Sequence, residues 1–403
     1  MQPDYDCVVV GAGLIGAAQA LALSRNNLKV AVVDIREPLR GEAGGDVRGL
    51  ALAPSSRRVI EGLDLWPKLA PRIVPIRHIH ISDQGRFGFT RLNAADVDLD
   101  ALGYVCPADD LLNVFEAALV EQCEVSWKTE VDGIDIAPDI ARVRLRGESG
   151  ATEITTRLVI GADGMGSPVR EAIGVATQTR DYRQCAVVAN VSLQYPVHET
   201  AFERFTVSGP LALLPLAGGR HVAIRCCGDT AVDELLKTSD EQYLNQLERG
   251  FGYRFGKFSD LGKRRSHKLV LGWADRVVDQ RVALVGAAAN TIHPNGAQGL
   301  NLGLRDVAVL ADSVERSQRT GGDIGGEECL SDFARQRVND QRDVIRFTDG
   351  LAQIFSSKLP LLGPLRNIAM VATDISPASK RWLIRRASGL FAESSLASAG
   401  VDG

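Results

Sequence analysis

Residues 4–35, DYDCVVVGAGLIGAAQALALSRNNLKVAVVDI, decide the fold. An apolar strand run leads into the spacing G-x-G-x-x-G, and small and apolar residues continue at helical spacing. The glycines Gly11, Gly13 and Gly16 can make a tight turn, admit a pyrophosphate against backbone N–H groups and let the helix pack on the strand. A second strand run ends in Asp34, where an acid can bind ribose hydroxyls and disfavours a 2′-phosphate. The stretch predicts a Rossmann-like unit that holds FAD or NAD.

Two later stretches repeat the pattern of a strand, a glycine-rich loop and a helix. Residues 154–174 run from an apolar strand into Asp163 and Gly164, and a helix is expected from Pro168. Residues 281–307 run from the strand RVALV through a loop of small residues into a second helical pattern. Ligands of α/β proteins collect beyond the carboxyl ends of the strands, so we expect the three junctions to converge on one extended cofactor.

The composition excludes several classes of protein. A chain of 403 residues allows two domains, and its net charge of -4 argues against a nucleic-acid binder built on bulk basicity. No run of eighteen apolar residues occurs, and the first residues lack the basic region of a signal peptide. The seven cysteines form no C-x-x-C pair, which predicts reduced thiols and a cytoplasmic protein. His78 and His80 share a face of a predicted strand but lack a third ligand, so no metal is expected.

The three glycine-rich stretches together resemble the aromatic-ring flavin monooxygenases of the para-hydroxybenzoate hydroxylase fold, and within them the ubiquinone-biosynthesis hydroxylases. Residues 47–70 and 201–220 are similar to the bacterial 2-polyprenyl-6-methoxyphenol hydroxylase branch. The resemblance covers nearly the whole chain. It implies FAD as the cofactor, NAD(P)H as a co-substrate and a ring hydroxylation that uses O2.

The resemblance also implies roles for single residues. Gly11, Gly13 and Gly16 would hold the pyrophosphate and Asp34 the adenosine ribose. Arg48 would lie near the phosphates and the ribityl chain, and the loop 293–299 would lie against the isoalloxazine ring. The remaining cofactor-binding candidates are Asp163, Gly164, Gly286, Gly299, Leu300 and Asn301. The flavin-loop positions closest to the chemistry would be His293, Pro294, Gly296 and Gln298.

One physical argument supports the flavin loop. A helix that begins near Leu300 would direct its free N–H groups at the pyrimidine edge of the flavin and favour negative charge there.

The family has Gly-Asp where this chain has Gly286 and Ala287. The missing carboxylate removes one hydrogen bond to the ribityl chain, worth on the order of 1 kcal/mol. We therefore expect weaker retention of FAD.

The expected fold is α/β, with a Rossmann-like FAD-binding domain, an inserted and mostly antiparallel β-sheet substrate domain and a helical C-terminus. The expected limits are 1–70, 105–180 and 270–345 for the discontinuous FAD-binding domain and 71–104 and 181–269 for the substrate domain. A C-terminal helical region at 346–390 and a tail at 391–403 complete the chain.

Several residues have two interpretations. His293 would either carry a proton or order its loop, and Arg170 would either bind a phosphate or lie in solvent. Arg305 and Asp306 would contact the flavin or form an ion pair at the surface or the helix end. Apolar strand residues would line a channel for a prenylated ring or form plain core. They are Phe202, Phe205, Leu211, Leu213 and Leu214.

The functional hypothesis is an FAD-dependent monooxygenase that hydroxylates 2-polyprenyl-6-methoxyphenol in ubiquinone biosynthesis. The alternatives are a sister hydroxylase acting at another ring position and a non-catalytic flavin-fold scaffold in a biosynthetic complex. Expected partners are a polyprenylated phenol lipid and ubiquinone-biosynthesis proteins, with no nucleic acid. Residues 378–391 combine basic and apolar side chains. They would either rest on an anionic membrane surface, which would place the protein in the cytoplasm at the periphery of the inner membrane, or form a basic helix packed on the protein itself.

Overall fold

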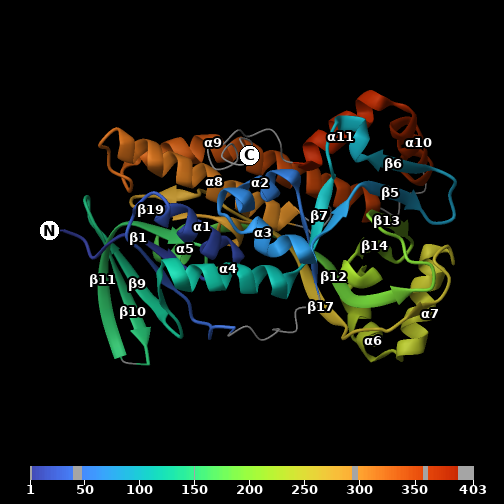
Figure 1. Cartoon of the computed structure of the whole chain (residues 1–403), viewed down its shortest axis with the longest axis horizontal. Helices are drawn as coiled ribbons and strands as arrows, with labels where there is room; N and C mark the ends of the chain where they lie inside the picture. Colours follow the sequence, from blue (N-terminus) through green and yellow to red (C-terminus); the bar gives the residue numbers. More distant parts are fainter. Residues whose placement is uncertain (1, 40–47, 149, 293–297, 357–361, 389–403) are drawn as a thin grey trace.

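The computed structural model describes residues 2–39, 48–148, 150–292, 298–356 and 362–388, and Figure 1 shows two sheets side by side under two long helices. The first sheet has the order β18-β19-β11-β1-β2-β8, with β10 and β9 extending from β11. Its central pairs β19–β11, β11–β1, β1–β2 and β2–β8 are parallel. The strands are β1 Tyr5–Val10, β2 Val30–Val33, β8 Glu124–Ser126, β9 Glu130–Ile136, β10 Ala141–Gly147, β11 Gly150–Gly161, β18 Val278–Asp279 and β19 Val282–Leu284.

Helices cover this sheet because its central strands are apolar on both faces, as parallel strands require. Helix α1 packs against both α4 and α8, and α9 lies along α8 (Figure 1). The main core combines the buried side chains of β1, β2, β11 and β19 with those of these helices. The helices are α1 Leu14–Ser24, α4 Ala108–Gln122, α5 Pro168–Ala172, α8 Gln298–Arg319 and α9 Glu327–Ser356.

The second sheet is largely antiparallel and has the order β20-β17-β12-β15-β14-β13-β5-β6, with β16 (Phe258–Ser259) beside β12. Among the described strand pairs of this second sheet, only β13–β5 is parallel. The strands are β5 His78–Asp83, β6 Phe89–Asn93, β12 Thr177–Leu193, β13 Thr200–Thr206, β14 Gly209–Pro215, β15 Arg220–Gly228, β17 Arg265–Ala274 and β20 Asn290–Thr291.

The two faces of the second sheet have different neighbours. Leu211 and Leu213 point to a cluster with Tyr243 and Leu247 of helix α7 (Asp240–Phe251), which lies with α6 (Val232–Lys237) at the lower right of Figure 1. On the other face, Ala201 packs with Val105 of a small third sheet, β3-β7-β4. Its strands are β3 Gly49–Leu52, β4 Val74–Ile76 and β7 Gly103–Pro107, and α2 Pro54–Gly62 and α3 Trp66–Leu69 follow β3.

Two further helices, α10 (Leu362–Ile375) and α11 (Pro377–Ser388), lie beside β5 and β6 at the upper right of Figure 1. The α/β fold with a Rossmann-like sheet, an antiparallel sheet and a helical C-terminus is therefore confirmed. All seven cysteines are free, as predicted. Helix α9 runs without a break across the limit that we expected at residue 345, and the domain limits stay a prediction.

Candidate functional site

The first glycine loop has one closed side and one open side. Gly11 has φ of 101°, and a Cβ there would lie 2.5 Å from the carbonyl oxygen of Ala162. A Cβ on Gly16 would lie 1.7 Å from the carbonyl oxygen of Gly11, so both positions exclude any larger residue. At Gly13, in contrast, no other described atom lies within 4 Å of a Cβ position. This open position at the start of α1 is where the sequence predicts a pyrophosphate.

The three glycine-rich junctions lie side by side. Val10, Gly161 and Leu284 are neighbours at the carboxyl ends of β1, β11 and β19. Gly286 has φ of 59°, and a Cβ there would lie 3.0 Å from Ile15 of α1. The expected convergence of the three junctions at one edge of the sheet is present in the structure.

Asp34 lies at the end of β2, where the acid was expected, and its side chain is buried. Its Oδ2 accepts a hydrogen bond from the backbone N–H of Ala12 at 2.5 Å, and its Oδ1 accepts one from the N–H of Arg36 at 2.7 Å. The Arg36 guanidinium donates to the carbonyl oxygen of Ala12 at 2.9 Å. Asp34 thus stabilises the glycine loop, and its contact with a ribose stays a prediction.

The second junction carries an unpaired polar atom. Asp163 accepts a hydrogen bond from the N–H of Val169 through Oδ2 at 3.0 Å, while its Oδ1 is buried and has no hydrogen-bond partner within the described ranges. Burial raises the pKa of this carboxyl. Gly164 has φ of 89°, and no other described atom lies within 4 Å of its Cβ position. An unpaired acceptor beside an open glycine fits a ligand that donates a hydrogen bond.

Arg170 does not lie in solvent, and its contact with a phosphate stays a prediction. Its side chain is buried, and it donates to the carbonyl oxygens of Ala288 at 2.8 Å and Met165 at 2.7 Å. Helix α5 begins at Pro168 as predicted, and the Ser167 hydroxyl caps it by accepting from the N–H of Arg170 at 3.0 Å. Arg170 therefore ties the second junction to the third.

The third junction is held from behind by a buried ion pair. Asp306 of α8 accepts from the N–H of Gly286 at 3.1 Å and from Nε of Arg337 at 2.7 Å. Asp306 and Arg337 are both 0% exposed, so the expectation of an ion pair at the surface is wrong. Arg305 is also buried and pairs with Asp340 of α9 at 2.8 Å. Sequence analysis missed Arg337 because it lies 31 residues beyond Asp306, on another helix.

The first turn of α8 offers backbone groups. Asn301 accepts from the N–H of Ala53 at 2.7 Å and from the hydroxyl of Ser56 at 2.6 Å, so its side chain serves to hold α2. Gln298 is buried and donates to the carbonyl oxygen of Ala387 at 3.3 Å. Gly299 and Leu300 lie in this same turn, whose N–H groups have no partner inside the helix. The candidates His293, Pro294 and Gly296 lie outside the described residues.

Arg48 directly precedes β3 of the small third sheet. Its side chain is exposed, and its carbonyl oxygen accepts from the N–H of Ala108 at 2.9 Å. A Cβ on the next residue, Gly49, would lie 2.9 Å from Val222 and 3.4 Å from Leu216, at the edge of the second sheet. The face of the second sheet that carries Val222 therefore adjoins the predicted cofactor site.

The apolar strand residues divide between the two faces. Phe202, Leu211 and Leu213 contribute to the core beneath α7, which supports the plain core interpretation for them. Leu214 packs on the opposite face, with Ala201.

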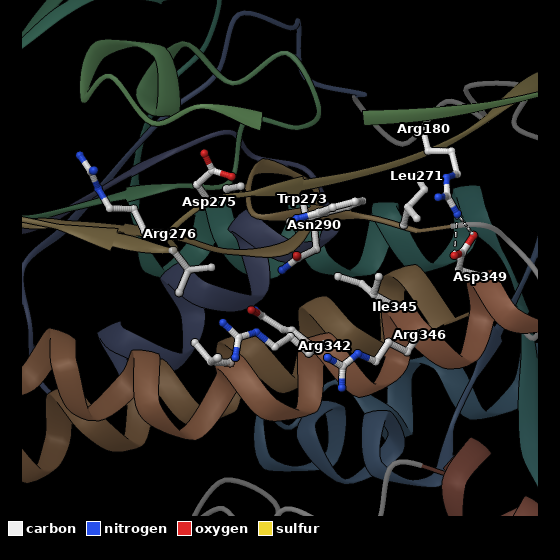
Figure 2. A pocket seen from close by; sticks show the side chains of 14 residues that line it. Arg180, Leu271, Trp273, Asp275, Arg276, Asn290, Arg342, Ile345, Arg346 and Asp349 are labelled. Atoms are coloured by element: carbon white, nitrogen blue, oxygen red, sulfur yellow. Dashed lines mark hydrogen bonds and ion pairs between the residues drawn. The ribbon is translucent and has the colours of Figure 1, made fainter. Parts of the chain in front are cut away.

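A cavity of about 430 Å3 lies between α9 and the strands β12, β17 and β20. Figure 2 shows Trp273 and Asn290 on the strand side and Arg342, Ile345 and Arg346 on the α9 side. Asn290 is buried, and its Nδ2 has no partner in the described part of the chain. The lining of the cavity thus combines apolar side chains, the Asn290 amide and more arginines than aspartates.

The two histidines of β5 have structural partners. Nδ1 of His78 forms a hydrogen bond with Oδ1 of Asn93 at 3.0 Å, and the His80 ring stacks on Phe89 at 5.8 Å. Across the described ranges no group of three or more His, Cys, Asp or Glu side chains could hold a metal ion.

Comparisons with known proteins agree with this geometry. The family model for the FAD binding domain matches residues 4–337. Ubiquinone hydroxylase UbiL of Rhodospirillum rubrum is 33% identical over 385 residues, which are 95% of this chain and 89% of that protein. The 3-demethoxyubiquinol 3-hydroxylase of Escherichia coli is 28% identical over 96% of this chain and 98% of its own length. Human ubiquinone biosynthesis monooxygenase COQ6 is 26% identical over 94% of this chain and 91% of its own.

A solved structure shows the same fold. The p-nitrophenol 4-monooxygenase PnpA of Pseudomonas putida superposes with a TM-score of 0.80 over 97% of this chain and 100% of its own, at 19% sequence identity. PqsL of Pseudomonas aeruginosa superposes with a TM-score of 0.77 over 90% of this chain and 99% of its own, at 20% identity.

Proposed function

Because this chain belongs to the FAD-dependent hydroxylases of ubiquinone biosynthesis, we propose that it hydroxylates the aromatic ring of a polyprenylated methoxyphenol with NAD(P)H and O2. The chain is an FAD-dependent monooxygenase, and the ring position and the electron donor are the parts proposed here. The observation that carries the proposal is the convergence of three glycine-rich junctions beside the face of the second sheet that holds Ala201 and Val222.

The residues at this edge fit FAD. Gly13 and Gly164 leave space for it, Asp163 offers the unpaired Oδ1, and the first turn of α8 offers free N–H groups. When bound, FAD supplies the redox chemistry that transfers one oxygen atom of O2 to the ring. The α8 N–H groups would stabilise negative charge at the flavin edge. The adjoining apolar sheet face would hold the phenol and exclude water.

The ring position is proposed as that of a 2-polyprenyl-6-methoxyphenol hydroxylase. The sister activity at another ring position is the second candidate, since one relative named above is a 3-demethoxyubiquinol 3-hydroxylase. Purified enzyme assayed on each phenol intermediate, with the product identified by mass spectrometry, separates them. An enzyme that hydroxylates only a later intermediate would exclude the first candidate. Absence of any hydroxylated product with bound FAD would favour the scaffold alternative.

The outer helices provide a contact with a membrane surface in this proposal. Trp382 of α11 is 60% exposed and Ile375 of α10 is 75% exposed, and α11 carries the basic pair Arg385 and Arg386 in its last turn. Aromatic and basic side chains together favour an anionic bilayer surface, where a long-tailed lipid resides. None of the described helices is long and apolar enough to cross a membrane. Binding to anionic liposomes should weaken when Trp382 is replaced by Ala, and unchanged binding would reject this contact.

A complex with other proteins of ubiquinone biosynthesis is also proposed, on the names of the relatives alone. Co-purification from cells with those proteins tests it.

A further inference from the structure

Glu203 is a carboxylate on the face of the second sheet that adjoins the cofactor site. Successive side chains of a strand point to opposite faces. On β13, Phe202 points to the α7 side, where its ring contacts Phe255 at 4.8 Å. Ala201 points to the other side and packs with Ile76 and Val105. Glu203 shares the face of Ala201 and lies one strand repeat, about 7 Å, further along β13.

The neighbours of Glu203 on this face are apolar. Its strand partners are Ile81 of β5 and Ala212 of β14, and Ile224 of β15 lies beyond Ala212. The side chain is partly accessible although protein surrounds it. Within the described ranges its carboxylate has neither a hydrogen bond nor an ion pair.

Among the described residues, Cys226 of β15 is a titratable neighbour on this face, and Glu203 contributes to the raised pKa of its buried thiol. Helix α10 packs over β5 and β6, and its Asp374 is already paired with Arg91 and Lys380. No described Arg, Lys or His shifts the pKa of Glu203.

An unpaired carboxylate in an apolar wall costs folding free energy, and carboxyl groups perturbed in this way cluster at functional sites. We propose that Glu203 is the general base that accepts the proton of the substrate phenol. This inference rests on the proposed phenol substrate. The phenol O–H bond breaks, the proton passes to a carboxylate oxygen of Glu203, and the electron pair stays on the phenol oxygen as phenolate. Phenolate is the more electron-rich ring and hence the better acceptor of an electrophilic oxygen. The proton later leaves Glu203 to solvent.

The acidity of Glu203 suits this role. Burial raises its pKa to about 7. A general base works best when its pKa lies near the operating pH, and a lower pKa would make it too weak to remove a phenol proton. Below pH 7 Glu203 is protonated, so hydroxylation should fall on the acid side.

The first test needs no turnover and uses the wild-type holoenzyme with a short-chain prenylated 2-methoxyphenol as the probe. The ionised Glu203 carboxylate accepts a hydrogen bond from the phenol O–H, so the Kd of this probe, measured without NAD(P)H, should fall as the pH rises from 6 to 8. A Kd that does not change over this range, or that rises, would overturn the inference.

The second test compares Glu203→Gln with Glu203→Asp. The Gln variant should lose this pH dependence of binding and show at least a 100-fold lower kcat, the lower end of what a general base contributes. The Asp variant should recover part of the activity and keep the acid limb of the pH profile. Glu199→Gln is the matched control, because Glu199 lies just before the same strand and forms a pair with Arg77 at the surface. It should leave kcat and the pH profile unchanged.

A Glu203→Gln variant with a kcat within threefold of wild type and the same acid limb would overturn the inference. That result differs from failure of the proposed function, in which the wild-type enzyme hydroxylates no prenylated phenol. Bound FAD, measured by absorbance in each variant, confirms that the cofactor site is intact.

Discussion

The backbone N–H of Gly286 donates a hydrogen bond to Oδ2 of Asp306 across 3.1 Å, and both residues are fully or almost fully buried. The carboxylate at the third junction thus comes from within α8 and faces the rear of the loop. Ala287, which replaces the family's Asp, is exposed at the front. Asp306 cannot substitute for the missing acid at a ribityl hydroxyl, because its oxygens are engaged by Gly286, Arg337 and Gln341.

Ala287→Asp should therefore strengthen FAD binding. Restoring one hydrogen bond adds on the order of 1 kcal/mol, which corresponds to about a fivefold lower Kd. The measurement is fluorescence titration of apoprotein with FAD. Ala287→Leu, whose side chain is similar in shape to that of Asp but accepts no hydrogen bond, is the control. An unchanged or higher Kd in the Asp variant would show that Ala287 does not face the ribityl chain.

Gly13→Ala should separate cofactor binding from folding. A Cβ at Gly13 meets no other described atom within 4 Å, and its φ of -64° suits any residue. The free energy of unfolding of the apoprotein should fall by no more than about 1 kcal/mol, the usual effect at a helix N-cap. The FAD Kd should rise at least tenfold, because the methyl group would occupy the predicted pyrophosphate position. Urea unfolding and FAD titration measure the two effects, and an unaltered Kd would place the pyrophosphate elsewhere.

Gly11→Ala, unlike Gly13→Ala, should affect folding as well as FAD binding. Its positive φ and the 2.5 Å approach to Ala162 predict an apoprotein that is itself destabilised.

Asp306→Ala should destabilise the protein strongly. The substitution leaves the Arg337 guanidinium buried without this partner, and breaking one side of a buried ion pair costs about 3–5 kcal/mol. The double variant with Arg337→Met should lose less than the sum of the two single changes. The pair Glu315 and Arg319 lies nearer the surface on the same helix and is the matched control, and Glu315→Ala should cost under about 1 kcal/mol. Equal effects of Asp306→Ala and Glu315→Ala on urea unfolding would contradict the buried network.

Glu203 should make stability depend on pH. Its pKa of about 7 lies above its ordinary value of 4.5, so the folded protein holds a proton that the unfolded chain releases between these values. The favourable contribution is complete below pH 4.5 and is lost as the pH rises to 7. Glu203→Gln should therefore stabilise the protein above pH 7, by at most about 3 kcal/mol, and have no such effect near pH 4.5. Urea unfolding at pH 5 and pH 8 measures this, and an equal effect at both values would argue against a raised pKa.

The sequence predicted those parts of the site that depend on local spacing. Gly11, Gly13, Gly16 and Asp163 lie at the ends of adjacent strands because strand, turn and helix signals are local. The position of Arg337 against Asp306 depends on how α9 packs on α8, and no local pattern encodes that packing. The two carbonyl oxygens that accept hydrogen bonds from Arg170 lie in two separate loops, and no local pattern indicates them. The sequence therefore predicted only a phosphate ligand or a solvated residue at this position.

Glu203 illustrates the same limit. Alternation along β13 shows that Glu203 and Phe202 face opposite ways, but it does not show which face adjoins the cofactor site. The packing of Ala201 against Val105, nearly a hundred residues away in the sequence, decides this. The motif signals therefore located the cofactor, whereas the face that would receive the substrate required the tertiary structure.

The central claim is that this chain uses FAD to place one oxygen atom from O2 on a prenylated methoxyphenol. The most direct measurement is a reaction of the purified FAD-loaded enzyme with that phenol and NAD(P)H under ¹⁸O2, followed by mass spectrometry of the product. The account predicts one ¹⁸O atom in each hydroxylated ring and none when the reaction is run under ¹⁶O2 in ¹⁸O-labelled water. A product that takes its oxygen from water, or NAD(P)H oxidation that yields no hydroxylated phenol, would contradict it.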